Sequence, residues 1–279
     1  MTTKVQPQDK TVIANGLNLH YLDWGGAAQT TMILLHGLRG HAHSWDDFSL
    51  AACQDFHVLA LDQRGRGDSD WAKDGDYTTP AYVADLAAFC DALNLDSFVL
   101  VGHSMGGRNS MFFAGENPEK LQKLVVVDVG PELDPRGGQR ITNEIVNVPE
   151  EFDSFEAVVE YQSKQNRFAS DAVLRRRLKY ATKELPNGKI GWRYDLEIRE
   201  SRRRGTVPPS ADLWPSLPKI TCPTLIVRGA ETDLLTPEVA QRMLDTLPNA
   251  QLVEIPRAGH MVFEDNPEDF IPAVRRFLS

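Results

Sequence analysis

The sequence predicts an α/β protein, with a doubly wound, mostly parallel sheet of eight strands and a helical cap inserted after the sixth strand. Two observations lead to this fold class. Short runs rich in β-branched residues alternate with segments whose apolar residues recur at helical spacing, which is typical of βαβ units. This alternation stops between about residues 131 and 218, where helical patterns follow one another without a convincing strand.

The first two strands are expected to form an antiparallel hairpin at one edge of the sheet. They cover Thr11–Ala14 and Leu17–Leu22 and flank Asn15-Gly16, a pair that favours tight hairpin turns. Six further strands are expected, and several are apolar at consecutive positions, as in parallel strands covered on both faces. They cover Thr31–Leu35, His57–Leu61, Phe98–Val101, Leu124–Asp128, Thr224–Val227 and Gln251–Ile255.

Helical spacing of apolar residues predicts four helices around this sheet, and three of them have a proline in their first turn. They cover Pro80–Leu93, Ser104–Gly115, Pro237–Leu247 and Pro267–Leu278. Three more helical patterns cover Phe152–Gln165, Asp171–Lys183 and Tyr194–Arg203, with Pro-Asn-Gly at 186–188 separating the last two. The predicted core is therefore 1–131 and 217–279, and the helical cap is 132–216. We expect the cap above the carboxyl ends of the strands, where open α/β sheets bind ligands.

Composition excludes several classes of protein. Of the 279 residues, 42% are hydrophobic and 25% are charged, which excludes a disordered chain or a coiled coil. The formal net charge of -9 argues against a nucleic-acid partner. The longest apolar stretches are shorter than the roughly 20 residues that span a bilayer, and Met1–Lys10 lacks the apolar stretch of a secretory signal.

The cysteines indicate the compartment in which the protein resides. The three widely spaced cysteines predict neither a disulfide framework nor a zinc site, and they fit buried thiols in a reducing compartment. We expect a cytoplasmic protein without membrane association, whose partner is a small-molecule substrate. Whether the protein is a monomer or a homo-oligomer stays open.

The strongest chemical signal is Gly102-His103-Ser104-Met105-Gly106, which follows a predicted strand and opens the next helix. This is the G-x-S-x-G pattern in the strand, turn and helix context that it requires. The glycines leave room for a strained turn, which lifts the Ser104 hydroxyl above the sheet at a helix N-terminus. Ser104 is therefore the predicted nucleophile.

A nucleophilic serine needs a base, and the base needs an acid that orients it. His260 follows the last predicted strand and precedes the last helix, at the same edge of the sheet as Ser104, so it is the predicted base. Asp233, just past the strand Thr224–Val227, is the preferred acid because it gives the chain order Ser, Asp, His. Asp128, at the end of the neighbouring strand, and Glu231 are the alternatives.

Stabilisation of the oxyanion is expected from two backbone amides. His36-Gly37-Leu38 follows the strand Thr31–Leu35, and the glycine lets this loop approach the nucleophile turn, so that the Leu38 amide points at the reacting oxygen. The Met105 amide, directly after the nucleophile, is the second donor. This chemistry requires neither a metal nor an organic cofactor.

Taken together, these motifs resemble the α/β-hydrolase fold superfamily. Their spacing resembles its capped esterase, lactonase and epoxide-hydrolase-like branch. The resemblance rests on His36-Gly37, Asp62-Gln63-Arg64-Gly65, Gly102-His103-Ser104-Met105-Gly106-Gly107, Asp233 and Gly259-His260. It implies Ser104 as nucleophile, Asp233 as acid, His260 as base and an all-helical cap at about 132–216. Some relatives take their acid from the strand end that corresponds to Asp128.

The expected function is that of a serine hydrolase that cleaves a carboxylic ester or lactone through an acyl-enzyme. Ser104 argues against epoxide hydrolases and haloalkane dehalogenases, which use an aspartate nucleophile. His103 stands where carbon–carbon bond hydrolases often carry asparagine, which disfavours that activity. The alternatives are a small-molecule receptor with an intact triad, or a cofactor-free haloperoxidase or carbon–carbon bond hydrolase of the same fold. The natural substrate and its acyl chain cannot be read from the spacing.

Overall fold

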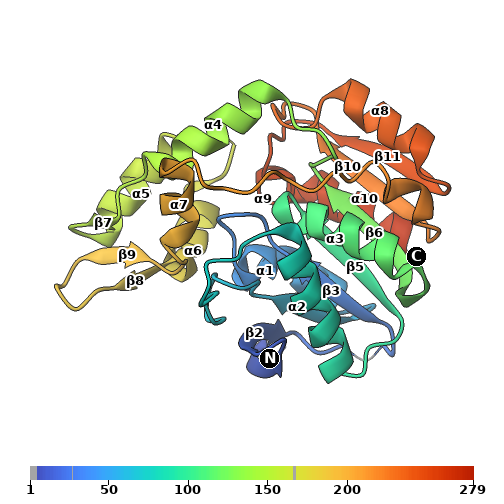
Figure 1. Cartoon of the computed structure of the whole chain (residues 1–279), viewed down its shortest axis with the longest axis horizontal. Coiled ribbons are helices and arrows are strands. Elements are labelled where there is room, and N and C mark those ends of the chain that lie inside the picture. The colour runs from blue at the N-terminus through green and yellow to red at the C-terminus, as the bar shows by residue number, and fades with distance from the viewer. Residues whose placement is uncertain (1–4, 27, 166–167) are drawn as a thin grey trace.

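The computed structural model describes residues 5–26, 28–165 and 168–279, so the first four residues of the polar N-terminal stretch lie outside the described residues. The described chain forms an eight-stranded sheet in the order β1-β2-β4-β3-β5-β6-β10-β11 (Figure 1). The strands are β1 (Gln8–Ala14), β2 (Leu17–Asp23), β3 (Thr31–Leu35), β4 (His57–Leu61), β5 (Phe98–His103), β6 (Leu121–Val127), β10 (Thr224–Gly229) and β11 (Ala250–Ile255). The six strands from β3 to β11 in this sheet run parallel, whereas β1 and β2 are antiparallel to their neighbours. The predicted eight-stranded, mostly parallel sheet is confirmed.

The hairpin at the sheet edge has the predicted turn. Ala14 pairs with Leu17, and Asn15 and Gly16 have φ angles of +50° and +73°. Positive φ at both central residues is what a type I′ turn requires, and the Asn-Gly pair adopts it at low cost.

Helices cover both faces of the sheet, as a doubly wound fold requires. One face packs against α2 (Thr79–Ala92), α3 (Met105–Glu116) and α8 (Pro237–Thr246), and the other packs against α1 (Asp46–Ala52) and α10 (Pro267–Leu278). Figure 1 shows α2 and α3 in front of the sheet. Successive strand residues alternate between the two apolar layers: Ile33 belongs to the first layer and Leu34 to the second. A run of consecutive apolar residues is therefore buried on both sides.

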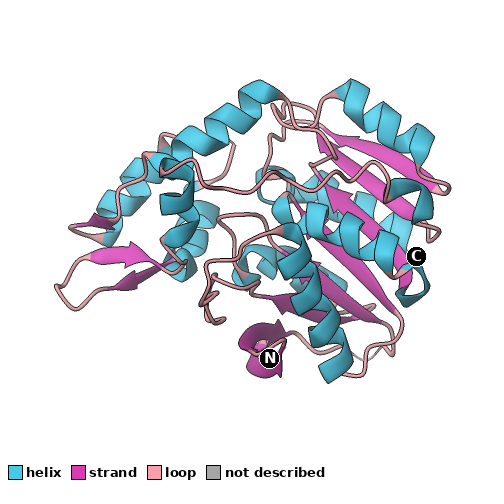
Figure 2. Ribbon diagram, viewed as in Figure 1, coloured by secondary structure: helices cyan, strands magenta, loops and turns pink. Residues whose placement is uncertain are grey.

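The segment between β6 and β10, residues 132–216, is called the inserted segment below. It contains α4 (Pro135–Val146), α5 (Phe155–Ser163), α6 (Asp171–Ala181) and α7 (Glu197–Arg203). It also contains a three-stranded antiparallel sheet in the order β7-β9-β8, formed by β7 (Glu151–Phe152), β8 (Thr182–Glu184) and β9 (Ile190–Trp192). Figure 2 shows this small sheet apart from the main one.

The expectation of an all-helical inserted segment is therefore wrong. Strands of two or three residues are too short to produce a recognisable alternation of apolar and polar residues. The Pro-Asn-Gly sequence at 186–188, which we expected between two helices, is part of the turn that joins β8 to β9. Gly188 has a φ of +77°, and its N–H donates to Leu185 O over 2.9 Å.

The inserted segment has an apolar cluster of its own and is tied to the rest of the chain by charged contacts. Its cluster contains Val148, Phe152, Val158, Val159, Leu174, Leu178, Trp192, Tyr194 and Ile198. Ion pairs join it to the rest of the chain at Arg140–Asp233, Glu144–Arg39, Arg176–Asp47, Arg177–Glu264 and Arg193–Asp68.

The cysteines are buried, as expected. Cys53, Cys90 and Cys222 are free thiols, and burial raises the pKa of each. Among the residues that the structure describes, no helix is both long enough and apolar enough to cross a lipid bilayer.

Candidate active site

Ser104 occupies the sharp turn between β5 and α3. Its φ is +54° and its ψ is −118°, a backbone conformation that is strained for a residue with a side chain. The turn needs glycine on both sides. A Cβ at Gly102 would lie 2.4 Å from Gly106 O, and a Cβ at Gly106 would lie 2.3 Å from Leu35 O. The G-x-S-x-G pattern is thus explained by close backbone contacts around the serine.

His260 lies between Ser104 and a carboxylate. Its Nε2 is 2.9 Å from Ser104 Oγ, and its Nδ1 is 2.8 Å from Asp128 Oδ2. Because an ionised carboxylate can only accept, Nδ1 carries the proton and Nε2 is the acceptor for the serine hydroxyl. The structure therefore brings together Ser104, His260 and Asp128, which was the alternative acid.

Asp128 is held rigidly at the end of β6. It is fully buried, and its φ of +52° is unusual for a residue other than glycine. Gly229 N–H donates to its Oδ1 over 2.9 Å, and the Thr232 hydroxyl donates to its Oδ2 over 2.6 Å. Gly229 is the last residue of β10, the strand beside β6, and Thr232 follows it. The carboxylate thus has a fixed direction before it receives the imidazole.

The preferred acid, Asp233, makes a different contact. Its carboxylate accepts two hydrogen bonds from Arg140 of α4, at 2.5 Å from Nε and 2.7 Å from Nη2. Arg140 lowers the pKa of Asp233 against the opposing effect of burial. The expected contact between Asp233 and the far nitrogen of His260 is therefore replaced by an ion pair with the inserted segment. Glu231, the third candidate, lines the same cavity as Ser104.

The loop that carries Leu38 lies against the nucleophile turn. A Cβ at Gly37 would be 2.8 Å from His103 Nδ1 and 3.2 Å from Ser104 Cβ. This proximity is what the predicted oxyanion donors, the Leu38 and Met105 amides, require. The assignment of these two amides stays a prediction.

A network of buried side chains supports this loop, and the sequence reasoning missed it. His36 Nε2 accepts from the Gln63 amide over 3.0 Å, so its Nδ1 donates to Gly37 O over 2.7 Å. Burial lowers the pKa of His36 to about 4, which keeps the ring neutral. The Gln63 side chain donates to His36 O over 2.7 Å and accepts from Asn109 of α3 over 2.8 Å. The only sequence feature that could have indicated this network is the Asp62-Gln63-Arg64-Gly65 motif, which contains Gln63.

A cavity of about 460 Å³ adjoins Ser104 and His260. Its apolar wall comes largely from the inserted segment, through Ile141, Ile145, Val148, Leu178, Ala181 and Trp192. Arg39, Arg140 and Arg177 also line it, each in an ion pair with a carboxylate. The Ser104 hydroxyl, hydrogen-bonded to His260, thus faces a mostly apolar chamber.

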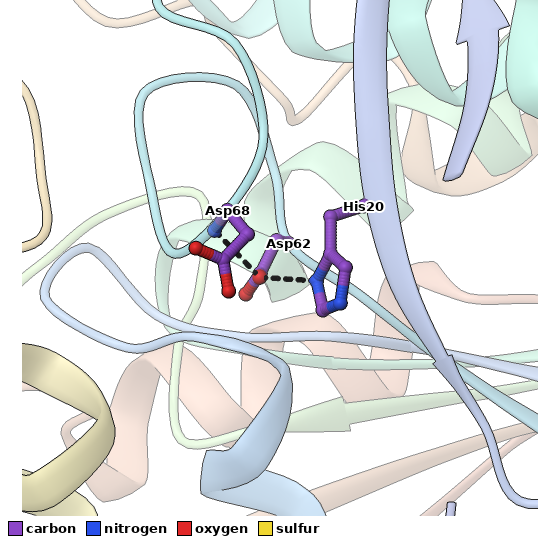
Figure 3. A group of neighbouring side chains, drawn as sticks. All are labelled: His20, Asp62 and Asp68. Carbon is purple, nitrogen blue, oxygen red and sulfur yellow. Dashed lines mark hydrogen bonds and ion pairs between the residues drawn. The ribbon is translucent and has the colours of Figure 1, made fainter. Parts of the chain in front are cut away.

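Three side chains that could hold a metal ion, His20, Asp62 and Asp68, lie near one another (Figure 3). Asp62 Oδ2 lies 2.7 Å from His20 Nδ1 and accepts from the Asp68 amide, and its Oδ1 accepts from the Ala42 amide. Burial alone would raise the pKa of Asp62, but the hydrogen bonds that its carboxylate receives from His20 and from the Ala42 amide hold it at about 2. These contacts explain the cluster as a brace between β2 and the loops after β3 and β4.

Comparisons with known proteins identify the family to which this fold belongs. A family model described as alpha/beta hydrolase fold matches residues 30–267. The 3-hydroxybutyrate-oligomer hydrolase of Cupriavidus necator is 32% identical over 86% of this chain and 86% of its own. The sn-1-specific diacylglycerol lipase of Mus musculus is 30% identical over 94% of this chain and 85% of its own. The crystal structure of an alpha/beta hydrolase from Novosphingobium aromaticivorans has a TM-score of 0.87 at 30% identity, with 98% of each chain covered.

The chain therefore belongs to the α/β hydrolase fold family. Hydrolase activity is what this family and these relatives support. The fold and the esterase-like resemblance predicted from the sequence are both confirmed.

Proposed function

We propose that this protein is a serine hydrolase that cleaves a carboxylic ester or lactone through an acyl-enzyme intermediate. The observation that carries the proposal is the continuous chain of contacts from Ser104 Oγ through His260 to the Asp128 carboxylate. A hydroxyl that is hydrogen-bonded to an imidazole acceptor can transfer its proton as it attacks a carbonyl carbon.

Each proton in the proposed reaction has a defined place. Ser104 Oγ forms a bond to the carbonyl carbon while its proton moves to His260 Nε2. The imidazolium then gives this proton to the leaving alkoxide as the ester bond breaks, which leaves an acylated serine. Water then attacks the acyl carbon while His260 Nε2 takes one of its protons. His260 returns this proton to Ser104 Oγ as the bond to the acyl carbon breaks, and the carboxylic acid leaves. Asp128 stays ionised throughout and stabilises the imidazolium.

The oxyanion of each tetrahedral intermediate is assigned to the amides of Leu38 and Met105. Preorganised backbone donors of this kind are worth about 3–4 kcal/mol each in the transition state. The His36–Gln63–Asn109 network supports the assignment because it holds the Gly37 carbonyl, and with it the orientation of the following peptide.

The cavity supports an ester with an apolar acyl or alcohol part. A chamber of about 460 Å³ with walls of Ile141, Ile145 and Trp192 matches an aliphatic chain better than a strongly charged group. The two curated relatives fit the same class, because oligomers of 3-hydroxybutyrate and diacylglycerols are both carboxylic esters.

We further propose that residues 132–216 are a cap and that residues 1–131 and 217–279 are the hydrolase core. The separate apolar cluster of the inserted segment supports this division, and so does its contribution to the cavity wall. In this arrangement the core supplies the chemistry and the cap selects the substrate.

Turnover of a series of p-nitrophenyl esters, from acetate to octanoate, tests the proposal, together with small lactones followed by acid release. Ser104→Ala should lower kcat by roughly 10⁶-fold, to the residual rate of a site without its nucleophile. Ser110→Ala is the matched control, because Ser110 is a buried serine of α3, the helix that directly follows Ser104, and its hydroxyl donates to Gly106 O. A folded wild-type protein that turns over every ester once or not at all would be a receptor, and the proposal would be wrong.

A further inference from the structure

Two carboxylates lie close to His260, and the inserted segment neutralises one of them. Asp128 and Asp233 follow the neighbouring strands β6 and β10. Thr232, the residue before Asp233, donates to Asp128 Oδ2, the same oxygen that receives His260 Nδ1. Asp233 and His260 also line the same cavity. Asp233 therefore directly follows a residue that hydrogen-bonds the carboxylate beside the base.

Arg140 determines the state of the second carboxylate. It is the sixth residue of α4, and its guanidinium binds Asp233 through two hydrogen bonds of 2.5 and 2.7 Å. A two-point contact between a planar guanidinium and a carboxylate fixes the direction of the carboxylate as well as its charge. Glu144, one helical turn further along α4, receives another hydrogen bond from Arg140 at 2.6 Å and keeps the guanidinium in place.

We propose that Arg140 is a positioning residue, which turns Asp233 away from His260 and leaves the orientation of the base to Asp128. Asp233 is then a second acid held in reserve by the inserted segment. This inference rests on the triad proposed above.

The arrangement has a physical advantage. Two free carboxylates beside one imidazole would compete for Nδ1 and would over-stabilise the imidazolium, which is inactive as a base. An arginine supplied by α4 removes both effects. It also couples the charge around the base to the position of α4, because lifting the helix would release Asp233.

The central experiment is a second-site rescue. Asp128→Asn should lose most of its activity on p-nitrophenyl acetate. Adding Arg140→Gln should free Asp233 to take over the contact with His260 and restore kcat at least about tenfold relative to Asp128→Asn alone. Adding Asp233→Asn to the double variant should abolish this recovery. Arg136→Gln in the Asp128→Asn background is the matched control, because Arg136 is an arginine of the same helix that pairs with Asp134.

A pH profile gives an independent measurement in the otherwise native protein. In Arg140→Gln the uncompensated Asp233 charge favours the protonated form of His260. The acidic limb of kcat/KM should therefore move to higher pH, by about half a unit, and Arg136→Gln should leave it in place. The other charged or titratable groups around His260 are the same in both variants. Among the described residues they include His103 of β5, Asp128 after β6, Arg177 of α6, Glu231 after β10 and Asp265 of α9.

The outcomes separate this inference from the function on which it rests. If Ser104→Ala or Asp128→Asn keeps full activity, the proposed triad is wrong. If both lose activity as expected, but Arg140→Gln neither rescues Asp128→Asn nor shifts the acidic limb, then Arg140 has only a structural role and the inference is overturned. Thermal unfolding of each variant shows whether the rates belong to folded protein.

Discussion

Replacing Asp128 with asparagine should disable the base by changing the position of its proton. Among the described residues, three donors reach the buried Asp128 carboxylate: the Gly229 amide, the Thr232 hydroxyl and His260 Nδ1. Asparagine keeps the outline of the side chain but replaces one acceptor oxygen with an NH₂ group, which can only donate. One of the two oxygen positions must therefore hold an NH₂ donor, which meets a donor that is already there.

The contacts decide which side this will be. If the NH₂ group faced Gly229, two N–H donors would meet in a fully buried place, and a backbone amide cannot turn away. If the NH₂ group takes the place of Oδ2, the Thr232 hydroxyl can rotate and accept, and His260 can accept at Nδ1. The second orientation costs less, but it moves the imidazole proton to Nε2. His260 then has no acceptor for the Ser104 proton.

The size of the effect follows from this change of tautomer. The same change in a well-studied protease triad lowers kcat by about 10⁴-fold. This factor corresponds to about 5.4 kcal/mol of transition-state stabilisation. We expect a loss of about 10³- to 10⁴-fold in kcat for Asp128→Asn, with KM little changed because the buried carboxylate does not reach the substrate. Asp233→Asn should cost less than about tenfold, because it removes a partly exposed ion pair.

The assay is the initial rate of p-nitrophenyl acetate hydrolysis at saturating substrate, with Ser104→Ala as the background rate. Circular dichroism and thermal unfolding show that each variant is folded. A larger loss for Asp233→Asn than for Asp128→Asn would refute the reasoning and return the acid to Asp233. Comparable losses of more than a hundredfold in both variants would mean that the two carboxylates share the role.

Three further predictions concern stability and specificity. Gly106→Ala should lower the thermal unfolding temperature and the esterase rate, because the new Cβ would lie 2.3 Å from Leu35 O. Gly138→Ala, which has open space around it in α4, should raise the free energy of unfolding by up to about 1 kcal/mol. Asp62 has a folded pKa of about 2 against a usual 3.8, so its ionised form contributes about 2 kcal/mol of stability above pH 4, of which about half is lost by pH 3 and the rest by about pH 1. The free energy of unfolding in urea should therefore fall less between pH 7 and pH 3 in Asp62→Asn than in the wild type, and an equal fall would contradict the assignment. Ala181→Leu should narrow the apolar wall and lower kcat/KM for p-nitrophenyl hexanoate about tenfold relative to acetate, and an unchanged ratio would remove Ala181 from the substrate site.

The parts of the protein that were predictable from the sequence depend on local physics. The strand Thr31–Leu35 could be recognised because Met32–Leu35 are four consecutive apolar residues, which is the pattern of a strand buried on both faces. Ser104 could be recognised because the glycines at 102 and 106 are required by backbone contacts within the turn itself and with the adjoining strand. His260 followed from its place after the last strand. In each case the information lies within a few residues of the feature.

The failed expectations have a different origin. The strands β7, β8 and β9 are stabilised by one another and by the apolar cluster of the inserted segment, and their two or three residues have no periodicity of their own. The network of His36, Gln63 and Asn109 joins three separate elements, so no single motif describes it.

The sequence by itself determined the fold class and singled out Ser104 and His260 as candidate nucleophile and base, because strand pattern, turn geometry and chain order are local properties. Only the tertiary structure decided between the two acids. The sequence favoured Asp233, although each of the two is an aspartate that follows a parallel strand next to the site. They differ in what the folded chain brings to them: Asp128 receives His260 from 132 residues away, and Asp233 receives Arg140 from 93 residues away. The first contact depends on how the strands of the main sheet assemble, and the second depends on how the inserted segment packs on the rest of the chain. Local sequence patterns do not contain either kind of information.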